Sequence, residues 1–132
     1  MLQQLLAFIL LCEFTTIRLS DETIRVELAQ THKEQVKGLK GRTELAENEG
    51  MLFVYETPQI LPFWMKGVKI PLSIGFFDEK RELIGVKEMA LSPIKIYYSP
   101  NLAQYALEMP AGWFERHNIP TGTRFEWDEH SR

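Results

Sequence analysis

The sequence predicts a β-dominated fold, an antiparallel sandwich or barrel with one or two short helices. Short apolar segments of strand length recur along the 132 residues, and prolines and glycines separate them. No helical pattern is long enough to cover both faces of a parallel sheet. A chain of this length forms a single globular domain whose core needs neither a disulfide nor a metal ion.

The strands are predicted from alternation and from the turn residues between them. Residues 23–29 alternate between apolar and charged side chains, which is the pattern of a half-buried strand. The polar reversal at residues 78–81 predicts a hairpin, and the prolines in residues 57–62 predict a connection. Further strands are expected at residues 51–55, 63–66, 72–77, 82–89, 104–109 and 123–127, with a brief one at residues 94–97 inside a long loop.

Two short helices are predicted. Thr31 and Glu34 have the spacing of a capping box, in which each side chain accepts a hydrogen bond from the backbone N–H of the other residue. We expect this short helix to run to about Lys37 and to bury Val36, before Gly38 and Gly41. The second helix should begin at Pro110, whose missing N–H costs nothing in a first turn.

Composition excludes some classes of function. The net charge is −3 and the basic residues are scattered, which argues against nucleic acid as a partner, because phosphate contacts need concentrated Lys and Arg. The single cysteine, Cys12, excludes an internal disulfide but does not exclude export.

The N-terminus carries an apolar run at residues 5–11, too short to cross a bilayer but suited to the core of a signal peptide. No Lys or Arg precedes it, and Leu11 stands before Cys12 where lipoprotein processing normally requires a small residue. We favour a signal peptide; lipidation of Cys12 and a structural segment stay open. Residues 1–17 are therefore set apart from a domain at 18–132, and we expect an exported protein of the periplasm or cell envelope, or a cytoplasmic one if residues 1–17 are structural.

No strong catalytic, phosphate-binding or metal-binding motif is present, so we expect no cofactor and no metal ion. His32, His117 and His130 share no ligand spacing and are expected to be surface or capping residues. Two carboxylates, Glu88 and Glu108, lie in apolar strand segments. A buried carboxyl could act as a general acid or base, whereas the ordinary interpretation is that each points to solvent.

Glu108 is the better candidate of the two, because Leu107 and Met109 flank it. A different chemistry is offered by residues 63–66, where alternation places Trp64 and Lys66 on one strand face. An aromatic ring beside an ammonium could hold a ring and an anionic group. The interpretation we favour is that Trp64 belongs to the core with Lys66 extending along it.

Several motifs occur in an order that resembles the DUF192 family, also called UPF0127. They are Gly38-Leu39-x-x-Arg42, Gly50-Met51-Leu52-Phe53, Phe63-Trp64-Met65-Lys66, Ile70-Pro71-Leu72, Tyr97-x-Ser99, Leu107-Glu108 and Ala111-Gly112. The resemblance covers about residues 24–127. It implies a β-sandwich of jelly-roll-like topology and frequent export, and it implies no established activity.

The sequence departs from the family pattern at three places. Gly67 and Val68 stand where Asn-Thr is usual, Ser73 stands where Asp is usual, and Lys40 stands where Met is common. A hydroxyl cannot replace a carboxylate as a base or as a charged metal ligand. This departure weighs against an enzyme.

Three hypotheses follow, in order of preference. The first is a non-catalytic envelope module that binds a small molecule, glycan or peptide at an edge formed by Trp64, Lys66 and Lys69. The second is an interaction or assembly factor that meets an envelope protein through an exposed sheet edge or aromatic patch. The third is a hydrolase or isomerase that uses Glu108 with Lys66 or Tyr97. The candidate site residues are Trp64, Lys66, Lys69, Tyr97, Glu108 and Arg42.

Overall fold

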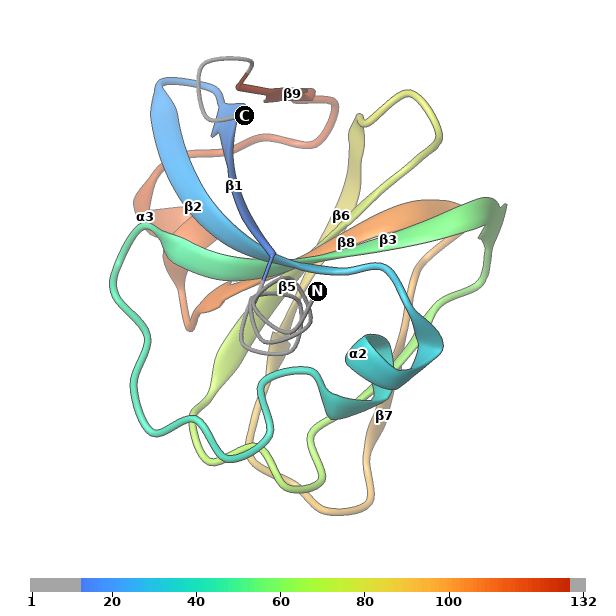
Figure 1. Ribbon diagram of the computed structural model, residues 1–132. Coiled ribbons are helices and arrows are strands. Elements are labelled where there is room, and N and C mark those ends of the chain that lie inside the picture. Colours follow the sequence, from blue (N-terminus) through green and yellow to red (C-terminus); the bar gives the residue numbers. More distant parts are fainter. Residues whose placement is uncertain (1–12, 129–132) are drawn as a thin grey trace, which may run out of the picture.

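The computed structural model describes residues 13–128 (Figure 1). The predicted leader run at residues 5–11 and Cys12 lie outside these residues. The strands are β1 (Phe14–Leu19), β2 (Glu22–Ala29), β3 (Glu49–Gln59), β4 (Pro62–Trp64), β5 (Leu72–Phe77), β6 (Leu83–Met89), β7 (Ile96–Tyr98), β8 (Ala103–Pro110) and β9 (Phe125–Trp127). The short helices are α2 (His32–Lys37) and α3 (Trp113–Arg116). The predicted β-dominated class with one or two short helices is confirmed over residues 13–128.

Seven strands form one curled sheet, a half-barrel, in the order β6-β5-β8-β3-β2-β1-β9. Its two edges approach each other, because Glu82 and Arg124 form an isolated antiparallel bridge and the N–H of Leu83 donates to the carbonyl of Thr123 at 2.9 Å. The remaining strands, β4 and β7, form a separate two-stranded ribbon. Figure 1 shows this ribbon's β7 at the end of the molecule opposite β9.

The topology differs from expectation in two respects. A jelly roll is not shown, since the strands form one curled sheet and a ribbon. Not every pair is antiparallel either, because β2 and β3 run parallel. A parallel pair requires a crossover connection, and α2 with the long loop after it supplies that connection. The strand β1 pairs with both β2 and β9, so it spans the boundary predicted between residues 17 and 18.

The first helix begins as predicted and packs differently. The capping box is formed: the N–H of Glu34 donates to Thr31 Oγ1 at 3.1 Å and the N–H of Thr31 donates to Glu34 Oε1 at 3.0 Å. The prediction that Val36 is buried is wrong, because α2 buries none of its residues and Val36 is 54% exposed. The second helix does not begin at Pro110, which ends β8; α3 starts after Gly112, whose φ of 80° suits glycine.

The apolar side chains form two clusters, one on each face of the sheet. The interior cluster fills the half-barrel and includes Leu52, Leu107, Trp113 and Phe125. The outer cluster lies between the sheet and the segments that cover it, with Met51, Phe53, Phe63, Ile74, Phe76 and Ala106 among its members. No helix among the described residues is long and apolar enough to cross a membrane.

Candidate functional site

A cavity of about 390 Å³ lies over the outer cluster, between α2, β4 and the middle of the large sheet. Its walls combine aromatic side chains, lysines and one carboxyl group. The lining residues are His32, Gln35, Val36, Lys37, Gly38, Leu39, Lys40, Phe53, Tyr55, Pro62, Phe63, Trp64, Lys66, Val68 and Glu108.

Glu108 is the carboxyl group of this cavity. It lies on β8, opposite Met51 of β3 and Ile74 of β5, in the centre of the sheet. Its side chain shares a strand face with Ala106 and not with Leu107 or Met109, which point into the half-barrel. The residue is 5% exposed and lines the cavity.

Burial changes the chemistry of this carboxyl. It raises the pKa of Glu108 from 4.5 to about 8, because a charged carboxylate is poorly solvated there. Burial also raises the pKa of the neighbouring Tyr55 to about 12, with a further contribution from the negative charge of Glu108. At neutral pH the acid therefore holds its proton most of the time and can donate a hydrogen bond into the cavity.

Aromatic rings form the floor and one wall. Phe53 and Phe63 pack edge to face with ring centroids 4.9 Å apart. Trp64 stands at the rim with 49% of its surface exposed, its Nε1 donates to the carbonyl of Pro93 at 2.8 Å, and Lys66 Nζ lies 5.1 Å from its ring centroid. The favoured interpretation of Trp64 as a core residue is wrong, because half of its surface is exposed; β4 pairs with β7 in a two-stranded ribbon that is separate from the large sheet.

Three lysines make the cavity electropositive. Lys37 comes from α2, Lys40 from the loop after it, and Lys66 from the turn after β4. Glu108 is the sole Asp or Glu among the described lining residues, and it is mostly neutral at pH 7. A concave surface with cationic groups and low-dielectric walls attracts small anions.

The structure brings together three of the six predicted site residues, Trp64, Lys66 and Glu108. Lys69 does not line the cavity. Arg42 forms an ion pair with Glu27 instead. Tyr97 lies in the outer cluster, where its hydroxyl accepts a hydrogen bond from the N–H of Ala90 at 3.2 Å.

Sequence reasoning missed the contribution of α2 and Tyr55. His32, expected as a surface or capping residue, lines the cavity together with Lys37 and Lys40. The capping box located the helix along the chain, but no sequence signal indicates that the helix lies above Glu108. The alternation in β3 could have placed Tyr55 on the same face as Phe53.

Ser73, where the family usually has Asp, lies on the opposite face of the sheet from Glu108, because its neighbour Ile74 is the register partner of Glu108. Its hydroxyl donates to Glu88 and accepts a hydrogen bond from the N–H of Gly112 at 2.7 Å. Glu88, from the adjacent strand β6, is exposed as expected, and its carboxylate also accepts hydrogen bonds from Ser73 and from the N–H of Gly112, which joins β5 to the turn before α3. Residues 13–128 hold no group of three or more side chains suited to a metal ion.

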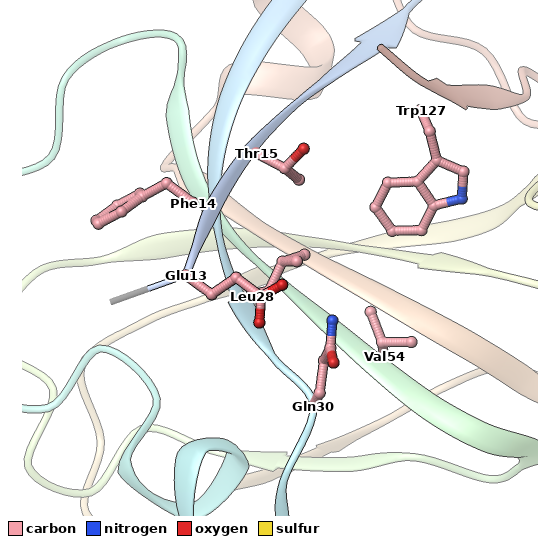
Figure 2. Close-up of a pocket in the computed structure, with 7 residues that line it drawn as sticks. All are labelled: Glu13, Phe14, Thr15, Leu28, Gln30, Val54 and Trp127. Carbon is pink, nitrogen blue, oxygen red and sulfur yellow. The ribbon is translucent and has the colours of Figure 1, made fainter. Parts of the chain in front are cut away.

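A second cavity, of about 490 Å³, lies beside β1 and β9 (Figure 2). Its described lining residues are Glu13, Phe14, Thr15, Leu28, Gln30, Val54 and Trp127, with Phe14 pointing away from the others. None of the predicted site residues lines it. The cavity at Glu108 is therefore the stronger candidate for a functional site.

Comparisons with known proteins agree with this fold. A structure from Sinorhizobium meliloti 1021, described as a candidate transcription regulator, matches with a TM-score of 0.82 and 27% identity, over 87% of this chain and 94% of that chain. A protein of unknown function from Novosphingobium aromaticivorans DSM 12444 matches with a TM-score of 0.82 and 30% identity, over 86% of this chain and 85% of that chain. No curated protein matches.

The family comparison confirms the resemblance found in the motifs. The model of DUF192, described as "Uncharacterized ACR", matches residues 15–127, which include every strand from β2 to β9 and all but the first residue of β1. The match thus covers most of the chain and includes the cavity at Glu108. The chain belongs to the DUF192 family.

Proposed function

We propose that this protein binds a small organic anion with an aromatic or apolar body in the cavity at Glu108. The observation that carries the proposal is the nearly buried carboxyl of Glu108, which lines the cavity below the lysines and aromatic rings. A protonated carboxyl that opens on a largely apolar cavity can donate a hydrogen bond to a ligand in a site of low dielectric, where such a bond is favourable.

The three parts of the cavity define the chemistry of the ligand. Its apolar or aromatic body would lie against Phe53 and Phe63. Its anionic group would lie near the ammonium groups of Lys40 and Lys66. Its far end would accept a hydrogen bond from the protonated Glu108. The volume of about 390 Å³ suits a compact molecule rather than a long polymer.

Ligand screening tests this proposal. Thermal-shift measurements with hydroxybenzoates, indole carboxylates and aryl phosphates should identify compounds that raise the Tm of the wild type, because a ligand that binds only the folded state stabilises it. Lys40→Ala and Glu108→Leu should each weaken the best compound about tenfold, since each removes a hydrogen bond to a charged or buried group. Lys80→Ala, an exposed lysine in the turn between β5 and β6, is the matched control and should have no effect.

Two results would count against the proposal. One is that no compound raises the Tm while native mass spectrometry shows no retained small molecule. The other is a compound that binds equally well to the wild type, Lys40→Ala and Glu108→Leu, which would place its site elsewhere.

A catalytic role for Glu108 is a second candidate, favoured by its pKa of about 8, which permits proton exchange near neutral pH. Lys66 lines the same cavity and Tyr97 does not, so only one of the two predicted partners is available. Turnover of a bound compound that stops in Glu108→Gln while binding persists would favour this role. We rank catalysis below binding, because the described lining residues include no second carboxyl group and no Ser, Thr or Cys that could act as a nucleophile beside Glu108.

Export stays a prediction from the sequence. The structure adds one constraint to it, because β1 begins at Phe14 and pairs with both β2 and β9. Cleavage at the predicted boundary after residue 17 would remove most of this strand. Mass spectrometry of the mature protein would locate the cleavage site, and we expect a site before Phe14 if the leader is removed.

A further inference from the structure

The outer face of the β4–β7 ribbon is apolar, and it is exposed within residues 13–128. Pro62 pairs with Tyr98 and Trp64 pairs with Ile96, and all four side chains are exposed. The pair between them, Phe63 and Tyr97, points inward and is buried. Adjacent positions on one strand face are contiguous, so these four exposed residues form a single apolar surface, here called the ribbon face.

A protruding loop extends the ribbon face. Ile94 is 83% exposed, the highest exposure of any large apolar side chain in residues 13–128. The loop is tied to the ribbon, because Trp64 Nε1 donates to the carbonyl of Pro93. The loop also has internal hydrogen bonds: Ser92 Oγ accepts from the N–H of Ile94 at 3.4 Å and from the N–H of Lys95 at 3.3 Å. Ile94 is thus held outward by ordered backbone.

The segments that build this surface are free of negative charge. Residues 57–77 and 89–107 contain no Asp and no Glu, although the whole chain has 18 acidic residues and a net charge of −3. Their charged residues are Lys66, Lys69 and Lys95. An acidic protein therefore presents its exposed apolar ribbon within purely cationic segments.

We infer that the ribbon face docks on the surface of a bilayer containing anionic phospholipids. Trp and Tyr suit the boundary between headgroups and acyl chains, because each has an apolar body and a polar end. Lysines beside them are attracted to anionic headgroups, and segments without Asp or Glu add no repulsion of their own.

The shape of the surface favours a bilayer over a protein partner. A protein interface carries about one hydrogen bond per 100–200 Å² and fits a complementary shape. The ribbon face instead offers apolar side chains and a protruding isoleucine, which need no directional partner. Trp64 belongs to both the ribbon face and the rim of the cavity, so docking would bring the cavity mouth close to the lipid surface.

Vesicle flotation of the full chain tests the inference. We expect the wild type to float with vesicles of equal parts phosphatidylcholine and phosphatidylglycerol, and to do so less at high ionic strength or with phosphatidylcholine alone. Ile94→Asp should reduce binding to vesicles at least about tenfold, because it removes the isoleucine that would enter the bilayer and adds a negative charge. Lys95→Ala should reduce it about fivefold. Neither residue lines the cavity, so this test is independent of ligand binding.

Matched controls lie away from the ribbon. Thr121→Asp adds the same charge in the exposed loop before β9, and Lys80→Ala removes an exposed lysine between β5 and β6; both should bind vesicles as the wild type does. A wild type that does not float with anionic vesicles overturns the inference and leaves a protein as the partner of the ribbon face. Flotation that Ile94→Asp and Lys95→Ala leave unchanged overturns it too, because another part of the chain would then make the contact.

Discussion

Glu108 makes the stability of the protein depend on pH. Its pKa is about 8 in the folded state against an ordinary value of 4.5, so between these values the folded state holds more protons than the unfolded state. The free energy of unfolding should therefore fall as the pH rises from about 4.5 to about 8. Since one pKa unit corresponds to about 1.4 kcal/mol, Glu108→Gln should be more stable than the wild type above this window by a few kcal/mol.

Urea unfolding at about pH 5 and about pH 9 measures this effect. The difference between the two conditions should shrink in Glu108→Gln and should persist in Glu126→Gln, whose side chain is half exposed. Equal pH dependence in the wild type and Glu108→Gln would show that the carboxyl is not held in its neutral form.

The burial of a single residue could be predicted from the sequence only where its neighbours along the chain determine its surroundings. The flanking Leu107 and Met109 made Glu108 a candidate, but the ordinary interpretation that it points to solvent is wrong: both neighbours lie on the other face of β8, and the residue is buried among the segments of the outer cluster. Trp64 was misjudged, because alternation indicates which side chains share a face but not whether another layer covers that face. The cover is a property of the tertiary fold.

At the scale of elements, the sequence located helices and hairpins better than strand ends. The capping box correctly predicted where α2 begins, and the polar reversal at residues 78–81 correctly predicted the hairpin of β5 and β6. The connection predicted at residues 57–62 is wrong in its first half, since β3 continues to Gln59. A register shift between Val54 and Gln59 lets the strand hold Pro58, because a bulge removes the need for a ladder hydrogen bond there.

The close packing of β3 against β8 depends on Gly50. A Cβ at this position would lie 2.3 Å from the carbonyl oxygen of Glu108 and 2.5 Å from Met109 Sδ. Gly50→Ala must therefore push β8 away at the residue that carries the site, and we expect it to lower the free energy of unfolding by about 1–3 kcal/mol. Urea unfolding of the purified variant measures the loss.

Gly85→Ala is the matched control for that substitution. Its Cβ would lie 3.0 Å from Pro100 Cγ, the edge of a ring on the surface side of β6, so a smaller loss is expected. The order of the two variants is the test, and a Gly85→Ala loss as large as that of Gly50→Ala would contradict the argument from close approach.

At the scale of the whole molecule, the class of fold was predictable and the closure of the sheet was not. Short alternating segments indicate strands, but their order in a sheet depends on long-range pairing. The parallel pair of β2 and β3 arises from the crossover through α2, and the approach of the two sheet edges arises from the bridge between Glu82 and Arg124. Neither contact leaves a local signal, because both join residues more than twenty positions apart.

The strand β9 has three residues, yet its Phe125 should support the whole half-barrel. The ring is fully buried and packs edge to face against Phe77 and Tyr105, each at 5.2 Å, and against Trp127 at 5.4 Å. Phe125→Ala leaves a cavity among these rings and should lower the free energy of unfolding by about 3–5 kcal/mol. Arg124→Ala, which alters the exposed neighbour, should cost less than about 1 kcal/mol. Urea unfolding, monitored by tryptophan fluorescence, compares the two variants. A decrease of less than about 1 kcal/mol in the free energy of unfolding of Phe125→Ala would show that the half-barrel is stable without the packing of its last strand.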